Sequence, residues 1–89
     1  MKGIITVVGK DQVGIIANVC TLLAKSNVNI LDISQTIVQG YFNMMMIVDV
    51  SKSNLSFEDL VNSLDAAGEN MGINVKLQHE DIFNSMHRI

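Results

Sequence analysis

The chain has 89 residues and a net charge of −3 at neutral pH, and 48% of its residues are hydrophobic. This length corresponds to a single domain, and the acidic balance argues against nucleic acid as a partner, because nucleic-acid-binding surfaces are basic. No apolar run approaches the roughly 18–20 residues that span a membrane, and the N-terminal residues lack the pattern of a secretory signal. We therefore expect a cytoplasmic protein that binds neither nucleic acid nor membranes.

The first half of the chain predicts a strand, a helix and a second strand. Residues 2–8 are mostly apolar and β-branched, which favours a strand. Asp11 is a good N-cap for a helix over 12–26, where apolar residues recur at helical spacing. The predicted buried stripe of this helix is Val13, Ile16, Val19 or Cys20, and Leu23. Residues 28–39 then alternate as a strand. Its apolar face is predicted to carry Leu31, Ile33 and Ile37.

The second half predicts a strand, a helix and a final strand. Residues 42–50 alternate with apolar side chains on one face. Ser56 is a good N-cap for the helix that follows, which has the most regular apolar stripe in the chain and ends at Gly72. Residues 73–79 alternate as the last strand. This order of elements predicts an α+β, ferredoxin-like βαββαβ fold, in which a four-stranded antiparallel sheet carries both helices on one face.

The turn before the first helix has the sequence Gly9-Lys10-Asp11-Gln12-Val13-Gly14-Ile15-Ile16-Ala17. Free N–H groups and the positive end of the helix dipole favour an anionic group at such a turn. A P-loop needs Lys and Ser or Thr directly after its second glycine. Isoleucines follow Gly14 here, so nucleotide hydrolysis is disfavoured. The alternative is purely structural: the glycines serve the turn and close packing, and Asp11 is a cap.

The same run resembles the start of an ACT domain, the small regulatory module attached to many amino-acid-metabolising enzymes. A second matching run is Asn27-Val28-Asn29-Ile30-Leu31-Asp32-Ile33-Ser34, at the beginning of the second strand. The resemblance covers residues 1–79 and is nearest to the small stand-alone bacterial ACT proteins similar to the glycine-cleavage repressor. It implies a homodimer or higher homo-oligomer, in which a small-molecule effector, above all an amino acid, binds between subunits.

The resemblance also implies which residues contact that effector. They are Gly9, Asp11, Gln12, Val13 and Gly14 of one subunit and Asn29 of the other. The amide of Asn29 offers both donors and an acceptor, which suits a zwitterion. The alternative is that Asn29 is only a polar residue between a turn and a strand.

Residues 80–89 form a separate tail after an ACT-like domain over 1–79. The tail carries Ile82, Phe83, Met86 and Ile89 at the spacing of one helical face. The open face of the predicted sheet is partly apolar, so we expect this tail, on its own or a partner's sheet, or a second subunit to cover it. The alternative is a frayed terminus.

The sequence contains no pattern that indicates catalysis, a metal or a cofactor. Cys20 lies on an apolar helix stripe without a histidine nearby, and His79 and Glu80 would point to opposite faces of a strand. One cysteine allows no intrachain disulfide, so self-association is the remaining way to support so small a core. We expect a non-enzymatic regulatory module that binds a small metabolite. The alternative is a regulator that contacts a metabolic enzyme or transcription factor directly, without a metabolite.

Overall fold

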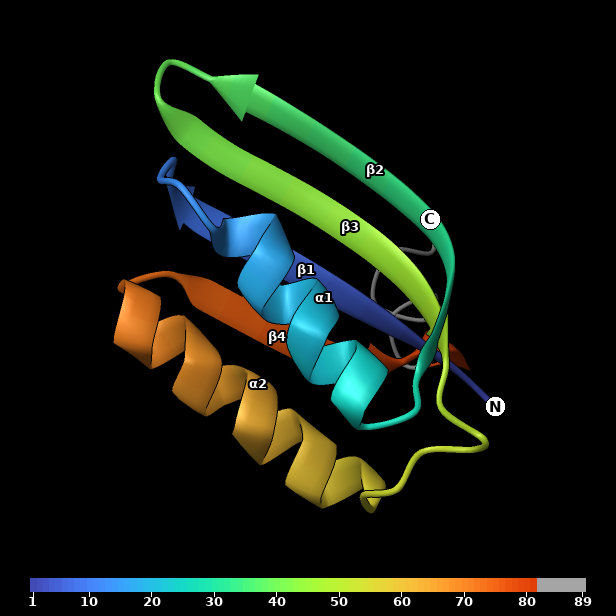
Figure 1. Ribbon diagram of the computed structural model, residues 1–89. Helices are drawn as coiled ribbons and strands as arrows, with labels where there is room; N and C mark the ends of the chain where they lie inside the picture. Colours follow the sequence, from blue (N-terminus) through green and yellow to red (C-terminus); the bar gives the residue numbers. More distant parts are fainter. Residues whose placement is uncertain (82–89) are drawn as a thin grey trace.

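The computed structural model describes residues 1–81 and contains the elements in the predicted order (Figure 1). They are β1 (Lys2–Lys10), α1 (Ile15–Lys25), β2 (Asn29–Val38), β3 (Tyr41–Asp49), α2 (Phe57–Met71) and β4 (Asn74–His79). The predicted tail lies outside the described residues from 82 onward. Within residues 1–81, neither helix is long and apolar enough to cross a membrane.

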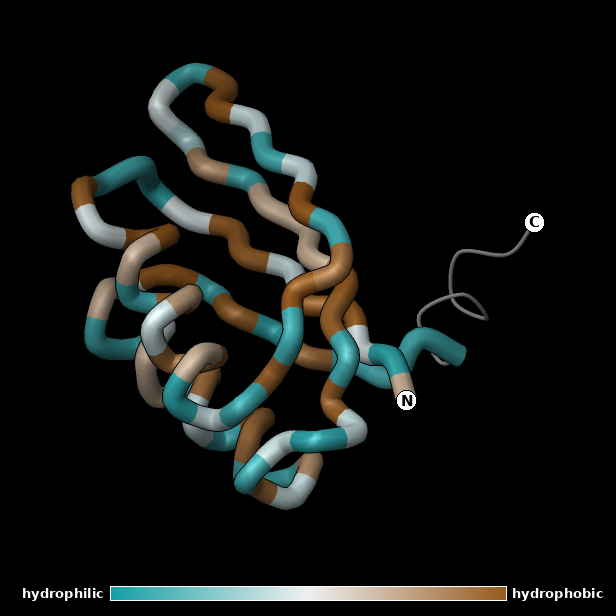
Figure 2. The backbone as a smooth tube through the Cα atoms, turned by 45° about the vertical axis from the view of Figure 1, so that its right-hand side comes forward, coloured by the Kyte–Doolittle hydropathy of each residue, from teal (hydrophilic) through white to brown (hydrophobic). Residues whose placement is uncertain are grey.

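The four strands form one sheet in the order β2-β3-β1-β4, and every neighbouring pair is antiparallel. Both helices lie on the same face of this sheet, over β1 and β4, while β2 lies farthest from them (Figure 1). The predicted ferredoxin-like fold is therefore confirmed. The hairpin of β2 and β3 reaches beyond both helices (Figure 1 and Figure 2).

The hydrophobic core fills the space between the helices and the two central strands. The alternation predicted for β3 is correct, because every second residue from Phe42 to Val48 is buried. The helix α2 also begins and ends as predicted: the Ser56 hydroxyl accepts a hydrogen bond from the Asp59 N–H, and Gly72 follows in the left-handed conformation. The largest fully buried side chains are Ile5, Val7, Ile15, Val19, Leu23, Met46, Val48, Leu60, Leu64 and Val75.

The start predicted for the first helix is wrong, and its buried stripe is right at Val19 and Leu23 but wrong at Val13 and Ile16. The helix α1 begins at Ile15, and its N-cap is Gly14, with φ of 94°, rather than Asp11. The buried residues of α1 are Ile15, Val19 and Leu23. Because Val13 precedes the helix, its side chain is fully exposed, and Ile16 falls beside the stripe rather than on it, with 38% exposure.

The face predicted for the second strand is also wrong in part. Ile30 pairs with Val48 and Asp32 with Ile47, so Leu31 is an extra residue that forms a β-bulge. Ile33 and Ile37 do share one face, the face toward the helices, but Leu31 does not lie in register with them. Every residue of β2 after Ile30 is exposed, because α1 and α2 lie over the other strands.

Candidate functional site

The turn between β1 and α1 is held in place by contacts at two other segments. The Asp11 backbone N–H donates to the Gly40 carbonyl oxygen at 2.8 Å, which ties the turn to the β2–β3 hairpin. The Gln12 side-chain amide donates to the Met71 carbonyl oxygen at 2.7 Å, which ties it to the end of α2. All three segments lie at the left of Figure 1. The turn is therefore a fixed junction rather than a free loop.

Both glycines of the motif have a structural reason to be glycine. A Cβ on Gly9 would lie 2.4 Å from Ile73 Cγ2, so only glycine allows β1 to pass so close to the start of β4. Gly14 has a positive φ, a conformation that other residues rarely adopt. The structural interpretation of the motif is thus satisfied at both positions.

A groove of about 240 Å³ lies between this turn and the helix-facing side of β2. It brings together three of the predicted ligand-binding residues, Asp11, Gln12 and Gly14. Gly9 and Val13 do not line it: Gly9 packs against Ile73, and Val13 projects into solvent at the tip of the turn. The other residues that line the groove are Ile15, Ile16, Ala17, Gln35, Ile37 and Phe42.

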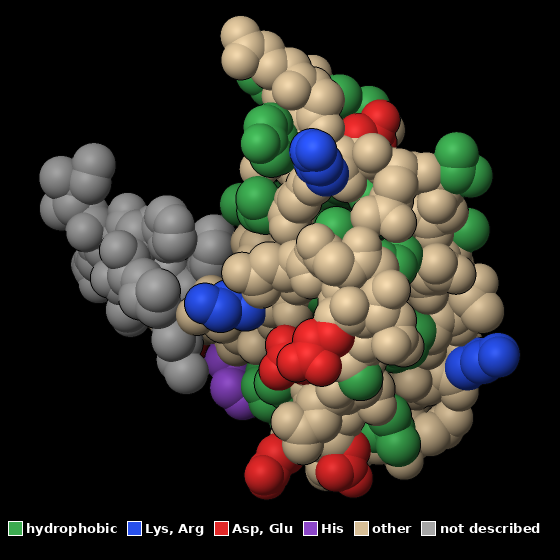
Figure 3. All heavy atoms as spheres, turned by 90° about the vertical axis from the view of Figure 1, so that its left-hand side faces the viewer, with side chains coloured by type: hydrophobic (Ala, Val, Ile, Leu, Met, Phe, Trp, Pro, Cys, Tyr) green, Lys and Arg blue, Asp and Glu red, His purple; other side chains and the backbone are tan. Residues whose placement is uncertain are grey.

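The sheet residues of the groove were not predicted. Gln35 and Ile37 are two residues apart and therefore lie on the same face of β2, and Ile37 pairs with the buried Phe42. The alternation of side chains along this strand was visible in the sequence, but the bulge at Leu31 determines which face of the sheet Gln35 and Ile37 occupy. Figure 3 views this end of the molecule and shows scattered charges of both signs rather than a continuous basic patch.

Asn29 lies at the opposite end of the sheet from the turn. It begins β2, whereas the turn adjoins the end of β2, and ten extended residues span about 30 Å. A single chain therefore does not bring Asn29 to the groove. Asn29 instead lines a larger hollow of about 440 Å³ with Ala24, Asn27, Val28, Asp49, Ser51 and Lys52.

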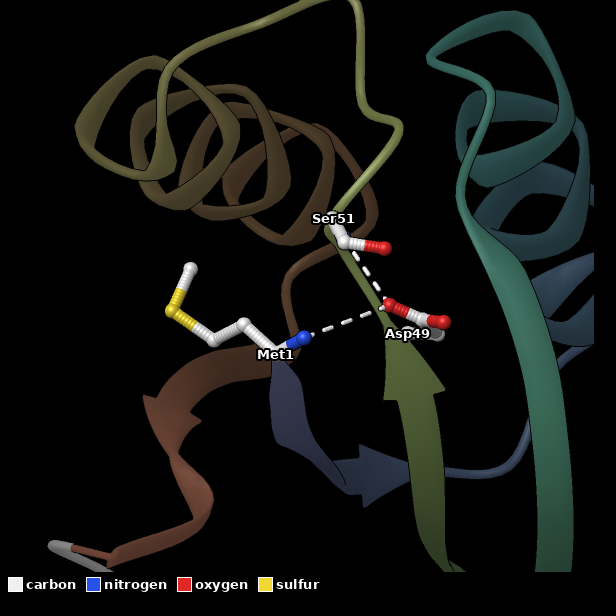
Figure 4. Close-up of polar contacts among 3 residues, drawn as sticks. All are labelled: Met1, Asp49 and Ser51. Carbon is white, nitrogen blue, oxygen red and sulfur yellow. Dashed lines mark hydrogen bonds and ion pairs between the residues drawn. The ribbon is translucent and has the colours of Figure 1, made fainter.

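Asp49 is the carboxylate of this second hollow, and its ionised form is stabilised (Figure 4). The Ser51 backbone N–H donates to Asp49 Oδ1 at 2.9 Å. The Met1 ammonium lies 3.6 Å from the same oxygen. The backbone and side-chain hydrogen bonds from Ser51, followed by the attraction of the ammonium group, lower the pKa of Asp49 below its ordinary value.

Comparison with known proteins identifies the family. The family model of the ACT domain matches residues 3–78. This chain belongs to the ACT domain family. An ACT domain protein from Streptococcus pneumoniae has 43% sequence identity and a TM-score of 0.81, and the match covers 93% of each chain. A UPF0237 protein of Bifidobacterium longum is 57% identical over 88 residues, which are 99% of this chain and 98% of that protein.

The fold also occurs as part of a longer protein. The regulatory subunit of aspartate kinase from Thermus thermophilus matches with a TM-score of 0.67 and 22% identity. The match covers 86% of this ACT domain and 50% of that chain, and at this identity it shows the fold alone. ACT domains are regulatory rather than catalytic at the level of the family, which makes a regulatory module the supported class for this chain.

Among the described residues of this ACT domain, β2 carries several of the exposed large apolar side chains, and its outer edge is open. No strand pairs with this edge among residues 1–81. Two apolar residues on its helix-facing side, Ile33 and Ile37, are 44% and 54% exposed. Leu31 and Val38 are also exposed, at 47% and 55%. An unpaired strand of this length offers a row of free backbone donors and acceptors to another strand.

The open face of the sheet also exposes apolar side chains. A shallow hollow of about 270 Å³ lies there, with exposed Val8 and Met45 among polar neighbours. The predicted cover for this face was the tail or a second subunit, and the tail from residue 82 onward lies outside the described residues.

The remaining candidate groups have packing roles. Cys20 is a partly buried free thiol that packs against the core. The His79 ring stacks on Phe57, with centroids 3.8 Å apart and planes 9° from parallel. In the part of the chain that the structure describes, no three His, Cys, Asp or Glu side chains are grouped to hold a metal ion.

Proposed function

We propose that this ACT domain is a homodimeric regulatory module that binds a small metabolite, above all an amino acid, beside its subunit interface. The observation that carries the proposal is the groove. It joins the turn residues Asp11, Gln12 and Gly14 to β2, the edge strand whose outer side has no partner among residues 1–81. A ligand in this groove would contact both the fixed turn and the strand that is available to a second subunit.

The dimer would form by pairing the two β2 strands across a two-fold axis. Such an interface is self-complementary, and two identical edge strands related in this way run antiparallel. Pairing would satisfy the free backbone donors and acceptors along the outer edge of β2. A domain of this size also gains from burying apolar surface against a second copy.

This pairing would bring Asn29 of one subunit to a site that lies about 30 Å from it within a single chain. In an antiparallel pair, the start of one β2 lies beside the end of the other. The Asn29 of one subunit would then lie beside the turn of its partner, and each dimer would contain two equivalent sites. The ligand-binding residues implied by the resemblance can therefore form one site only if Asn29 comes from a second chain.

The chemistry of the turn suits an amino acid. Asp11 is exposed and offers a carboxylate to an ammonium group. The N-cap Gly14 has no side chain, so the first N–H groups of α1 receive no side-chain cap and favour a carboxylate. Ligand binding would stabilise one arrangement of the dimer and shift its population, and a contact with another protein would read that shift.

The test combines molar mass with thermal shift against the common amino acids. We expect a dimer whose midpoint rises with a subset of them, since a ligand at 100 times its Kd stabilises the native state by about 2.7 kcal/mol. Asn29→Ala should abolish the rise, whereas the control Asn62→Ala, on the exposed side of α2, should retain it. A monomer, or an unchanged response in Asn29→Ala, would contradict the shared site.

A second candidate function is a regulator that binds its target protein directly. The observation in its favour is that Gly9 and Gly14 are both explained by packing and backbone conformation, without a ligand. A flat thermal-shift panel on an intact dimer would support this candidate over the metabolite sensor.

A further inference from the structure

We propose that the ligand of the groove carries an apolar side chain, and that Ile37 on β2 selects it. This inference rests on the binding function proposed above and adds the class of ligand. It follows from the composition, charge and size of the groove.

Most of the side chains that line the groove are apolar. Phe42 is one of them and is 3% exposed. Ile16 from α1 and Ile37 from β2 also line the groove, and both retain exposed apolar surface, at 38% and 54%. A ligand side chain that covers these surfaces removes apolar area from water, which favours binding of an aliphatic group.

The charge of the groove disfavours charged side chains. Asp11 is the one ionisable residue among those that line it, and no lysine or arginine of residues 1–81 is among them. An acidic ligand side chain would lose its hydration without gaining a cation. A basic side chain would compete with the ligand's own ammonium group for Asp11.

The remaining polar side chains that line the groove are the neutral amides of Gln12 and Gln35. The Gln12 amide nitrogen is already bonded to the Met71 carbonyl oxygen at 2.7 Å. At about 240 Å³, the groove is also smaller than the roughly 300–1,000 Å³ of sites for drug-sized ligands, so it suits a metabolite of amino-acid size.

Ile37 is a better candidate for selection than Phe42 or Ile15, because those two belong to the hydrophobic core. Its neighbour on the same face, Ile33, has similar exposure but does not line the groove. The two isoleucines therefore form a matched pair: both lie on the helix-facing side of the edge strand, and one of them reaches the groove.

The test is calorimetric titration of the full-length dimer with leucine, isoleucine, valine and methionine, and with serine, aspartate and lysine. We expect the tightest aliphatic ligand to bind at least about tenfold more strongly than the polar ones, since one methylene in an apolar pocket changes affinity by about 10- to 200-fold. Ile37→Thr, which keeps the β-branched shape, should weaken the aliphatic ligand by about tenfold or more. The matched control Ile33→Thr should leave its Kd within about twofold, because Ile33 does not line the groove.

The outcomes separate this inference from the function on which it rests. Tightest binding of serine, aspartate or lysine, lost in Asn29→Ala, would refute the apolar ligand and leave the metabolite site intact. Aliphatic binding that Ile37→Thr and Ile33→Thr weaken equally would refute the selecting role of Ile37. No binding of any amino acid to an intact dimer would overturn both proposals and favour the regulator that binds its target protein directly.

Discussion

The close approach of β1 and β4 at Gly9 gives the sharpest prediction for stability. In Gly9→Ala the new Cβ would lie 2.4 Å from Ile73 Cγ2, 2.7 Å from Ile73 Cβ and 3.1 Å from Ile73 Cα. Atoms so near the backbone cannot rotate away, so β4 must shift relative to β1. Overpacking of this kind costs about 1–3 kcal/mol, and the depth of the overlap places this case near the upper end.

The unfolded state partly offsets that cost. The φ of Gly9 is outside the left-handed region, so alanine is compatible with the backbone and lowers the entropy of the unfolded chain, which stabilises by about 0.4–1 kcal/mol. The net expected loss is about 2 kcal/mol, or about 8–16 °C in Tm for a domain of this size.

Gly3→Ala on the same strand is the matched control. There the new Cβ would lie 2.9 Å from Leu77 Cδ1, the far end of a flexible side chain, and 3.3 Å from the Gln78 backbone oxygen, so its overlap with the backbone is much smaller than at Gly9. Displacing that rotamer costs about 1 kcal/mol, which the unfolded-state term nearly cancels. Urea unfolding of both variants and the wild type, with equal m-values, measures the difference. Equal stability of the two variants would refute the packing argument for Gly9.

Three further outcomes follow from the described contacts. Ser56→Ala should lower the free energy of unfolding by about 1 kcal/mol, because the Ser56 hydroxyl caps α2 by accepting a hydrogen bond from the Asp59 N–H. Ser56→Asp should restore the stability, and an equal loss in both variants would exclude the cap. The lowered pKa of Asp49 stabilises the fold above the ordinary carboxylate pKa, and this contribution is lost as pH falls through the lowered value. Urea midpoints from about pH 7 to about pH 2 should therefore fall more steeply in the wild type than in Asp49→Asn. Val13→Ser should change stability by less than about 0.5 kcal/mol, since Val13 is fully exposed; a core-sized loss would instead support its predicted place on the buried stripe.

Local patterns predicted the second half of the fold well. Both ends of α2 are determined locally, because the Ser56 cap uses a hydrogen bond three residues away and Gly72 ends the helix through its own left-handed backbone conformation. The alternation of β3 also needs no distant information, since β3 is a central strand with one face on the hydrophobic core. These elements are determined by short-range chemistry that is visible in the sequence.

Long-range contacts explain the errors in the first half. Asp11 has the better side chain for a cap, yet its N–H bonds to Gly40 in a hairpin that lies far along the chain, and the helix starts after Gly14. The bulge at Leu31 depends on the register between β2 and β3, which alternation alone does not determine. The turn of the candidate site was therefore predictable from its motif. The presence of Ile37 in the site was not, because it depends on the register between β2 and β3.

The edge of β2 also has a consequence for the newly made chain. Natural sheets protect edge strands with lysine, proline or short length. This strand is ten residues long and contains neither lysine nor proline, and Asp32 is its single charged residue. An isolated monomer therefore offers a template for strand addition to any extended chain, including unfolded copies of itself. In the dimer proposed above, assembly soon after synthesis would protect this edge against aggregation. Overproduction of a chain that fails to assemble would then give insoluble protein.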